Sequence, residues 1–266
     1  MLGAIAGDII GSVHEGRGGK TMEFPLFIRG STFTDDSVLT IATAEALMSV
    51  RPYDETYREF GRRYPNAGYG GTFLQWIFTE GAGPYGSWGN GSAMRVSPVA
   101  WAHDRLEDVL AEAARSAAVT HDHPEGIKGA QAVAAAVFLA RMGSTKDEIR
   151  REVNGRFGYD LDRRIEQIRP AYGFDISCQG SVPEALLCFL DSESFEEALR
   201  LAISLGGDAD TQACIAGAVA EAFYGGVPEA IVAEVRSRLP EDLLAVVRRF
   251  EKRFIATTEG NSGAVR

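Results

Sequence analysis

Large apolar side chains recur every three or four positions along much of this 266-residue chain, which is the spacing of a buried helix face. Residues 240–256 carry four of them, and residues 228–239 carry three more behind a proline that suits a first helical turn. These side chains are Leu243, Val247, Phe250, Phe254, Ile231, Val235 and Leu239. No stretch alternates β-branched and polar residues as a half-buried strand would. The pattern predicts an all-α fold built from many short and medium helices.

Helix starts are indicated by capping boxes, in which a Ser or Thr and a Glu three residues later satisfy free amides of the first turn. Four segments fit this pattern, with Asp replacing Ser or Thr in the first, and each predicts a helix start: Asp104–Glu107, Thr145–Glu148, Ser181–Glu184 and Ser194–Glu197. Alanine-rich stretches at 111–118, 130–140 and 213–222 suit helices that pack closely against their neighbours.

Composition limits the class of protein. Hydrophobic residues make up 45% of the chain and charged residues 24%, which is ordinary for a globular domain. No linker divides the chain, so we expect a single compact, orthogonal multi-helix domain over residues 1–256 and a flexible polar tail over 257–266. No apolar run reaches the roughly 20 residues of a membrane span, and Met1–Asp8 lacks the basic start of a signal peptide.

Charge and cysteine content narrow the partners and the compartment. A formal net charge of −10 disfavours the phosphate backbone of duplex nucleic acid as a partner, and no membrane partner is expected. Three cysteines at unpatterned positions (Cys178, Cys188 and Cys214) favour a reducing, cytoplasmic location over a disulfide framework or a zinc site.

Glycine is the exception to an otherwise helical composition, because its 30 residues are clustered rather than scattered. The clusters are Gly3–Gly11, Gly68–Gly71, Gly81–Gly91 and Gly206–Gly207. A helical core needs no such clusters, so we interpret them as places where the backbone approaches a ligand closely.

Two acidic clusters precede expected helices at 37–49 and 211–224. They are Thr34-Asp35-Asp36-Ser37 and Gly206-Gly207-Asp208-Ala209-Asp210-Thr211. Either cluster alone would be explained as a helix cap, because Asp, Ser and Thr satisfy the free amides at a helix start. Two similar clusters indicate more, since paired carboxylates with hydroxyls are the hard oxygen ligands that Mg²⁺, Mn²⁺ or Ca²⁺ prefers. The spacing therefore offers a site for two divalent cations as an alternative to plain capping, and such cations would relieve the repulsion among four carboxylates.

A small, polar loop at 86–92 runs into the apolar positions of an expected helix that starts near Met94. Its backbone amides could bind an anion, although a flexible turn with a helix cap would look the same. Trp88 inside this loop suggests a platform for stacking. His121-Asp122-His123 lacks metal-ligand spacing, so His121 is interpreted as a hydrogen-bonding residue at a helix end.

Six motifs in order along residues 1–225 resemble those of the ADP-ribosylglycohydrolases, a family of all-α hydrolases. They are Gly7-Asp8-Ile9-Ile10-Gly11-Ser12, Thr34-Asp35-Asp36-Ser37, Gly68-Tyr69-Gly70, the segment from Gly86 to Arg95, Thr120-His121 and the segment from Gly206 to Thr211. Ser37 stands where Thr is common in the family, which keeps the hydroxyl. The chain is also short, which leaves the acceptor open.

The resemblance implies a role for each matching residue. The ligands of two Mg²⁺ (or Mn²⁺) ions would be Thr34, Asp35, Asp36, Asp208, Asp210 and Thr211. The ADP-ribose moiety would be bound by Gly68, Gly70, Ser87, Trp88, Gly89, Asn90, Gly91 and His121. Glu15 matches a glutamate on a mobile loop beside the metals, as a general acid/base or a gate. It is counted as catalytic together with the metal-site carboxylates Asp36 and Asp208.

The function implied by the resemblance is metal-dependent hydrolysis of the glycosidic bond between ADP-ribose and an acceptor on a protein or small molecule. One alternative is a metal-dependent phosphohydrolase that cuts the diphosphate itself. Another is a non-catalytic ADP-ribose-binding relative, which the full set of six metal-type side chains argues against. The acceptor, the physiological metal and the oligomeric state stay open.

Overall fold

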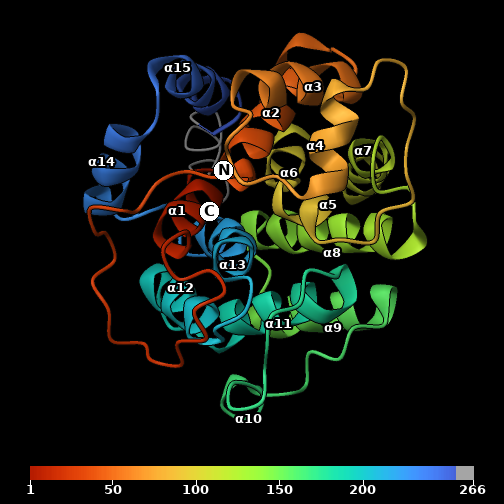
Figure 1. The fold of residues 1–266 in the computed structure, drawn as a ribbon. Coiled ribbons are helices and arrows are strands. Elements are labelled where there is room, and N and C mark those ends of the chain that lie inside the picture. Colours follow the sequence, from red (N-terminus) through yellow and green to blue (C-terminus); the bar gives the residue numbers. More distant parts are fainter. Residues whose placement is uncertain (256–266) are drawn as a thin grey trace.

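Two helices lie side by side at the centre of the molecule in the computed structural model, which describes residues 1–255 (Figure 1). They are α1 (Leu2–Gly11), which is buried along its whole length, and α13 (Ala209–Phe223), which is buried from Ala209 to Glu221. Three more helices pack against α13: α8 (Pro124–Arg141), α11 (Cys178–Asp191) and α12 (Phe195–Ser204). The other helices surround this centre, with α2 (Asp35–Ser49) packed on α1.

The all-α prediction is confirmed, because residues 1–255 form one helical domain in which the only β pairing is an isolated bridge between Gly89 and Ser177. The remaining elements are α3 (Tyr53–Arg63), α4 (Gly71–Phe78), α5 (Gly91–Met94), α6 (Ser97–Ala102), α7 (Leu106–Ala118), α9 (Lys146–Phe157), α10 (Ile165–Ile168), α14 (Glu229–Arg238), α15 (Glu241–Phe250) and the π-helical turn η1 (Glu251–Ile255). The tail expected at 257–266 lies outside the described residues.

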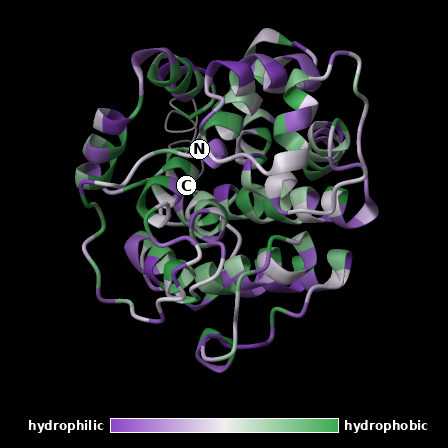
Figure 2. Ribbon diagram, viewed as in Figure 1, coloured by the Kyte–Doolittle hydropathy of each residue, from purple (hydrophilic) through white to green (hydrophobic). Residues whose placement is uncertain are grey.

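Hydropathy follows the packing. Figure 2 shows apolar residues along the central helices and hydrophilic residues on outer helices such as α14 and α15. Among the described helices, none is both long enough and apolar enough to cross a bilayer.

Two of the four predicted capping boxes do not start a helix. Helix α7 begins after Arg105 without a capping side chain, and Ser181 lies inside α11 because the hydroxyl of Ser177 caps that helix four residues earlier. The box at Thr145–Glu148 is confirmed in both of its hydrogen bonds. At α12 Ser194 caps the helix, but the Glu197 carboxylate accepts from the amide of Glu193 instead.

The first glycine cluster packs helices together, which corrects its interpretation as a ligand approach. Gly3, Gly7 and Gly11 are spaced by four residues and share the face of α1 that meets α13. A Cβ atom added to Gly7 would lie 2.0 Å from the carbonyl oxygen of Ala213, and one added to Gly11 would lie 2.5 Å from Cα of Asp210. The two backbones are therefore in contact, and this contact places α1 beside the start of α13.

We expect the substitution Gly7→Ala to destabilise the fold by about 3 kcal/mol, the upper part of the range for overpacking, because the added methyl group meets backbone. For a protein of this size that lowers Tm by roughly 6–12 °C in thermal unfolding. Gly155→Ala is the matched control, because Gly155 lies on an exposed face of α9 with open space around its Cα. It should be neutral or stabilise the helix by up to about 1 kcal/mol. Equal melting temperatures for the two variants would contradict the packing described here.

Candidate active site

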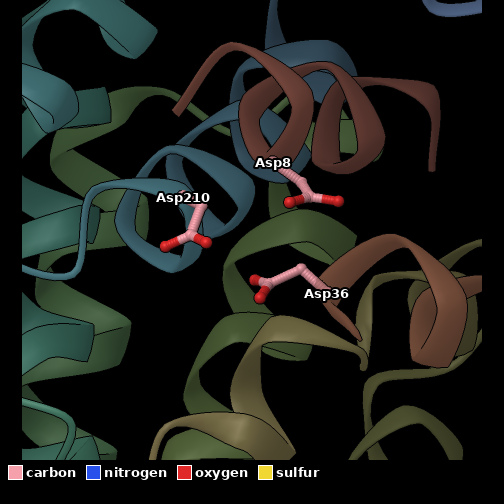
Figure 3. A group of neighbouring side chains, drawn as sticks. All are labelled: Asp8, Asp36 and Asp210. Atoms are coloured by element: carbon pink, nitrogen blue, oxygen red, sulfur yellow. The ribbon is translucent and has the colours of Figure 1, made fainter. Parts of the chain in front are cut away.

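Three buried aspartates from three different helices point toward one another (Figure 3). They are Asp8 of α1, Asp36 in the first turn of α2 and Asp210 in the first turn of α13, and one oxygen of each lies within 4.8 Å of the others. A second group of the same kind joins Glu15, Asp208 and Asp210. Asp210 belongs to both groups, so the two groups form one continuous set of oxygen atoms.

Asp8 is the member of this set that the site predictions missed, although it stands in the first matching motif. Its carboxylate accepts four hydrogen bonds from the start of α2: from the Thr34 amide (2.9 Å) and hydroxyl (2.6 Å), and from the Ser37 amide (3.1 Å) and hydroxyl. Asp8 therefore holds the Thr34–Ser37 turn in place. The available signal was a single acid within an otherwise apolar helical segment, since a fully buried carboxylate needs partners.

Three other polar side chains, those of Thr34, Thr211 and Asn90, form hydrogen bonds with residues of the two acidic clusters. The Thr34 hydroxyl accepts a hydrogen bond from the amide of Asp36, and the Thr211 hydroxyl donates to Oδ2 of Asp36 (3.2 Å). The side-chain amide of Asn90 donates to Oδ2 of Asp208 (2.7 Å), which joins the loop before α5 to the second acidic cluster. Each of the two clusters thus begins its helix and faces the other. Only the first cluster caps its helix as the capping interpretation requires, because Asp208 at the start of α13 makes no capping hydrogen bond.

Burial and mutual repulsion raise the pKa values of these acids. Burial is the largest cause for Asp8, Asp36 and Asp210, and for the last two the neighbouring carboxylates add to it. For Asp35 burial followed by the charges of Asp8 and Asp208 raises the pKa from its ordinary value of 3.8 to about 8. Without a cation these side chains retain protons that an isolated carboxyl would lose, because gathering their charges is unfavourable.

The donor set fits a divalent cation. All of its atoms are carboxylate or hydroxyl oxygens, the ligands of Mg²⁺ and Mn²⁺. Oδ1 of Asp36 is buried and has no hydrogen-bond partner within the described part of the chain, which is costly for a carboxylate unless a cation approaches it.

The pKa shifts predict how the stability of the metal-free protein depends on pH. The folded-state pKa of Asp35 lies above its unfolded value, so its contribution to stability is present near pH 4 and is lost progressively up to about pH 8. In thermal unfolding with EDTA, Tm should therefore fall over this range. Saturating Mg²⁺ or Mn²⁺ at pH 8 should raise Tm by about 5–10 °C, because binding at a hundredfold excess over Kd contributes about 2.7 kcal/mol. An equal ionic strength of NaCl is the control, and a Tm insensitive to both cations would contradict a metal site.

Except for Asp8, the acids lie at the wall of a cavity of about 640 Å³. The structure places every predicted site residue on its lining: Glu15, Thr34, Asp35, Asp36, Gly68, Gly70, Ser87, Trp88, Gly89, Asn90, Gly91, His121, Asp208, Asp210 and Thr211. Gly68 follows Ala67, whose carbonyl accepts from the Asp35 amide (2.7 Å), and it has a φ of +103° that a larger residue would rarely adopt. The predicted residues are thus brought to one cavity, while their roles stay predictions.

The 86–91 loop offers fewer free amides than its sequence suggests. The amides of Gly86, Ser87, Gly89 and Asn90 already donate to protein acceptors, namely the Asp122 carboxylate, the Thr120 carbonyl, the Ser87 hydroxyl and the Ile176 carbonyl. An anionic group bound here would rely on the remaining amides and on side chains. The helix expected to start near Met94 is also two short helices, α5 and α6, joined at Arg95 and Val96.

Two exposed apolar residues on the cavity lining were missed. Phe174 and Ile176 are 55% and 54% exposed, beside Trp88 at 49%. The segment that carries them is joined to the 86–91 loop by two hydrogen bonds, from the Asn90 amide to the Ile176 carbonyl (2.8 Å) and from the Cys178 amide to the Trp88 carbonyl (3.0 Å). No local sequence motif marks this segment, because its position depends on pairing with a loop that lies about 90 residues earlier in the chain.

The fold and the cavity together define an all-helical protein in which a cavity lined by carboxylates lies at the ends of the central helices. The profile of the ADP-ribosylglycohydrolase family matches residues 1–260 of the sequence. The chain therefore belongs to the ADP-ribosylglycohydrolase family, as the sequence motifs predicted, and it is a glycosidic hydrolase.

Individual relatives agree with this assignment. The chain is 28% identical to ADP-ribosylhydrolase ARH3 of Homo sapiens, over 92% of this chain and 90% of ARH3. It is 27% identical to ADP-ribosylarginine hydrolase Tri1 of Pseudomonas putida (strain GB-1), over 88% of this chain and 72% of Tri1. A solved structure of an ADP-ribosylglycohydrolase-related protein complex is similar with a TM-score of 0.73 and 26% identity, covering 96% of this chain and 97% of the other.

Proposed function

We propose that this chain is a binuclear-metal-dependent hydrolase that cleaves the glycosidic bond between ADP-ribose and an acceptor on a protein or small molecule, releasing ADP-ribose. One observation carries the proposal: Asp210 stands in both groups of carboxylate oxygens, with Asp36 in one and Asp208 in the other, and these three line a cavity that also presents the 86–91 loop with Trp88. A shared carboxylate between two groups is suited to two cations held close together.

Six residues from the two acidic clusters at the starts of α2 and α13 would hold the metal ions, which would be Mg²⁺ or Mn²⁺. They are Thr34, Asp35, Asp36, Asp208, Asp210 and Thr211. Bound cations of this kind stabilise developing negative charge and lower the pKa of water. Asp8 would orient the first cluster through its four hydrogen bonds, since partners of this kind fix the direction of a ligand.

Glu15 is proposed as the general acid/base or as a gate over the bound substrate. It lies in the segment between α1 and α2 and shares an oxygen group with Asp208 and Asp210. Burial, followed by the charges of Asp208 and Asp8, raises the pKa of its carboxyl. A raised pKa lies closer to neutral pH, and a carboxyl with such a pKa can both give and take a proton during the reaction.

The glycine-containing segments of the same cavity wall would bind the ADP-ribose moiety. The backbone would approach the diphosphate and ribose where the lining residues are small. These residues are Gly68, Gly70, Ser87, Gly89 and Gly91, and Asn90 and His121 lie on the same lining. Trp88 would stack on the adenine, because its ring is half exposed and lies on the cavity lining.

Replacing Trp88 by alanine should weaken ADP-ribose binding by about 1–3 kcal/mol, which is about 5- to 150-fold in Kd, borrowing the scale of stacking on nucleic-acid bases. The melting temperature should stay unchanged, because the side chain is outside the core. Phe78→Ala is the matched control, since Phe78 is 58% exposed and is absent from the lining of this cavity. Calorimetry that gives both variants the same Kd would assign Trp88 a role outside adenine binding.

The remaining parts of the proposal concern the setting of the reaction. The three cysteines are free and buried, which suits the reducing cytoplasm. We place the hydrolase domain at residues 1–256 and expect neither a membrane nor duplex nucleic acid as a partner.

A panel of ADP-ribosylated substrates, including ADP-ribosylarginine, ADP-ribosylserine and O-acetyl-ADP-ribose, tests the proposed reaction. With Mg²⁺ or Mn²⁺ present, mass spectrometry should detect intact ADP-ribose from at least one substrate, and EDTA should abolish its release. AMP as the product would instead show a phosphohydrolase that cuts the diphosphate. Binding of ADP-ribose with no product from any substrate would show a binding protein without turnover.

A further inference from the structure

His121 lies in the cavity wall. Its Nδ1 forms a hydrogen bond with Thr120, and its Nε2 faces the 86–91 loop. Only 5% of the residue is exposed. Its Nδ1 lies 2.8 Å from the hydroxyl of Thr120, and a Cβ atom added to Gly91 would lie 3.1 Å from its Nε2. Which nitrogen carries the proton decides whether this ring offers a donor or an acceptor to a ligand against the loop.

The hydrogen bonds around Thr120 determine that choice. Arg95 is fully buried, its guanidinium lies over the Tyr57 ring, and its Nη2 contacts the Thr120 hydroxyl oxygen (2.8 Å) and the Ser116 carbonyl (3.2 Å). A guanidinium only donates, so the Thr120 oxygen must accept from Arg95. The hydroxyl then has one proton of its own to donate, and the neighbour placed to accept it is Nδ1 of His121.

The other tautomer, with the proton on Nδ1, would leave the buried hydroxyl proton of Thr120 without an acceptor. If Nδ1 carried the proton, the Thr120 oxygen would accept from both Arg95 and His121. The hydroxyl proton would then lack an acceptor among its contacts in residues 1–255, although Thr120 is fully buried. An unsatisfied buried donor is unfavourable, so the hydrogen-bond chain from Arg95 Nη2 to the Thr120 hydroxyl to Nδ1 of His121 is the arrangement that gives this hydroxyl both a donor and an acceptor.

We propose that Arg95 and Thr120 are positioning residues that hold neutral His121 with its proton on Nε2, so that the ring is a fixed hydrogen-bond donor to the ligand. The ligand part of this inference rests on the proposed function. A fixed donor at this point favours an oxygen that only accepts, such as an oxygen of a diphosphate. It disfavours a ligand group that needs to donate there.

The electrostatic surroundings agree with a neutral ring. Burial, followed by the charge of Arg95, lowers the pKa of His121 well below its usual range. Tyr85 is the aromatic neighbour on the cavity side, with its ring centroid 6.2 Å from that of His121. Arg95 therefore has two effects on the same ring, one through Thr120 and one through its charge.

Nitrogen-15 NMR of the full-length protein, labelled at its four histidines, reports the tautomer directly without any ligand. His121→Gln assigns the resonances by removing them. At pH 7 the wild-type spectrum should show Nδ1 of His121 unprotonated and Nε2 protonated. Thr120→Val should convert this signature to a mixture or to the other tautomer, while Thr120→Ser, which keeps the hydroxyl, should preserve it. ADP-ribose affinity should fall about threefold to tenfold in Thr120→Val and recover in Thr120→Ser.

Thr43→Val is the matched control, because Thr43 is a buried threonine whose hydroxyl contacts the Tyr57 hydroxyl (2.9 Å) and does not touch Thr120 or His121. It should leave the His121 signature unchanged. A protonated Nδ1 in the wild-type protein would overturn the inference, and so would an unchanged spectrum in Thr120→Val or an equal change in Thr43→Val. Absence of ADP-ribose binding to the wild-type protein would instead overturn the proposed function, and the spectrum would still decide the tautomer.

Discussion

Asp210→Asn should remove metal binding and turnover together, and it should do so more completely than any other single change in the acidic set. Asp210 is the carboxylate that both oxygen groups share, so its loss weakens each of them. Changing a residue that merely supports a metal ligand costs about 10–100-fold, so a shared ligand should cost more than about a hundredfold in metal affinity and in rate. Calorimetric titration with Mn²⁺ and the rate of ADP-ribose release measure the two losses.

In the absence of metal, the same substitution should leave the stability of the fold unchanged or increase it. Removing one carboxylate relieves repulsion among buried acids, so Asp210→Asn should melt at or above the wild-type Tm in EDTA. Glu184→Gln is the matched control, because Glu184 is a buried acid in α11 that pairs with Arg163 outside the cavity lining. It should keep metal affinity and turnover. Wild-type metal affinity in Asp210→Asn would remove the basis for the binuclear site.

Glu15→Gln should separate binding from chemistry. The substitution keeps the shape of the side chain and removes the group proposed to transfer a proton, so turnover should fall by about a hundredfold or more. ADP-ribose affinity and most of the metal affinity should remain, because the six proposed metal ligands are intact. Rates under saturating substrate, together with calorimetry of ADP-ribose and Mn²⁺, give the comparison.

Glu23→Gln is the control in the same segment, since Glu23 is exposed and is absent from the cavity lining. It should behave as wild type. Near-normal turnover in Glu15→Gln would make Glu15 an ordinary surface acid. If Glu15→Gln loses metal while Asp208→Asn retains it, then Glu15 is a ligand and the two proposed roles are exchanged.

The helical fold could be predicted because the spacing of apolar residues is a local property of the chain. The regions 228–239 and 240–256 show this, since Val235, Leu243 and Val247 are buried as their spacing predicts. Helix starts were less predictable. Ser181 has the neighbours of a capping residue, but the Ser177 hydroxyl caps α11 first, and the sequence of the box alone does not show which candidate wins.

The candidate site was found where adjacent residues carry the chemistry and missed where distant segments supply it. Asp35 and Asp36 stand next to each other, so their cluster is visible in the sequence. Asp8 is isolated among apolar residues, and it meets the Thr34–Ser37 turn only because α1 packs beside α2. Phe174 reaches the cavity lining through pairing of its segment with the 86–91 loop, which no periodicity reveals.

The glycine contact between α1 and α13 fixes a dimension of the site that side chains elsewhere would leave adjustable. A side chain can change rotamer to absorb a neighbouring substitution, but two backbones in contact have no such freedom. Because Asp8 and Asp210 project from these two helices, the separation of their Cα atoms is set by that contact. The helices thus act as a rigid frame for the acids. Glu15 and Phe174 project from connecting segments instead, so their positions are not fixed by this contact between helices.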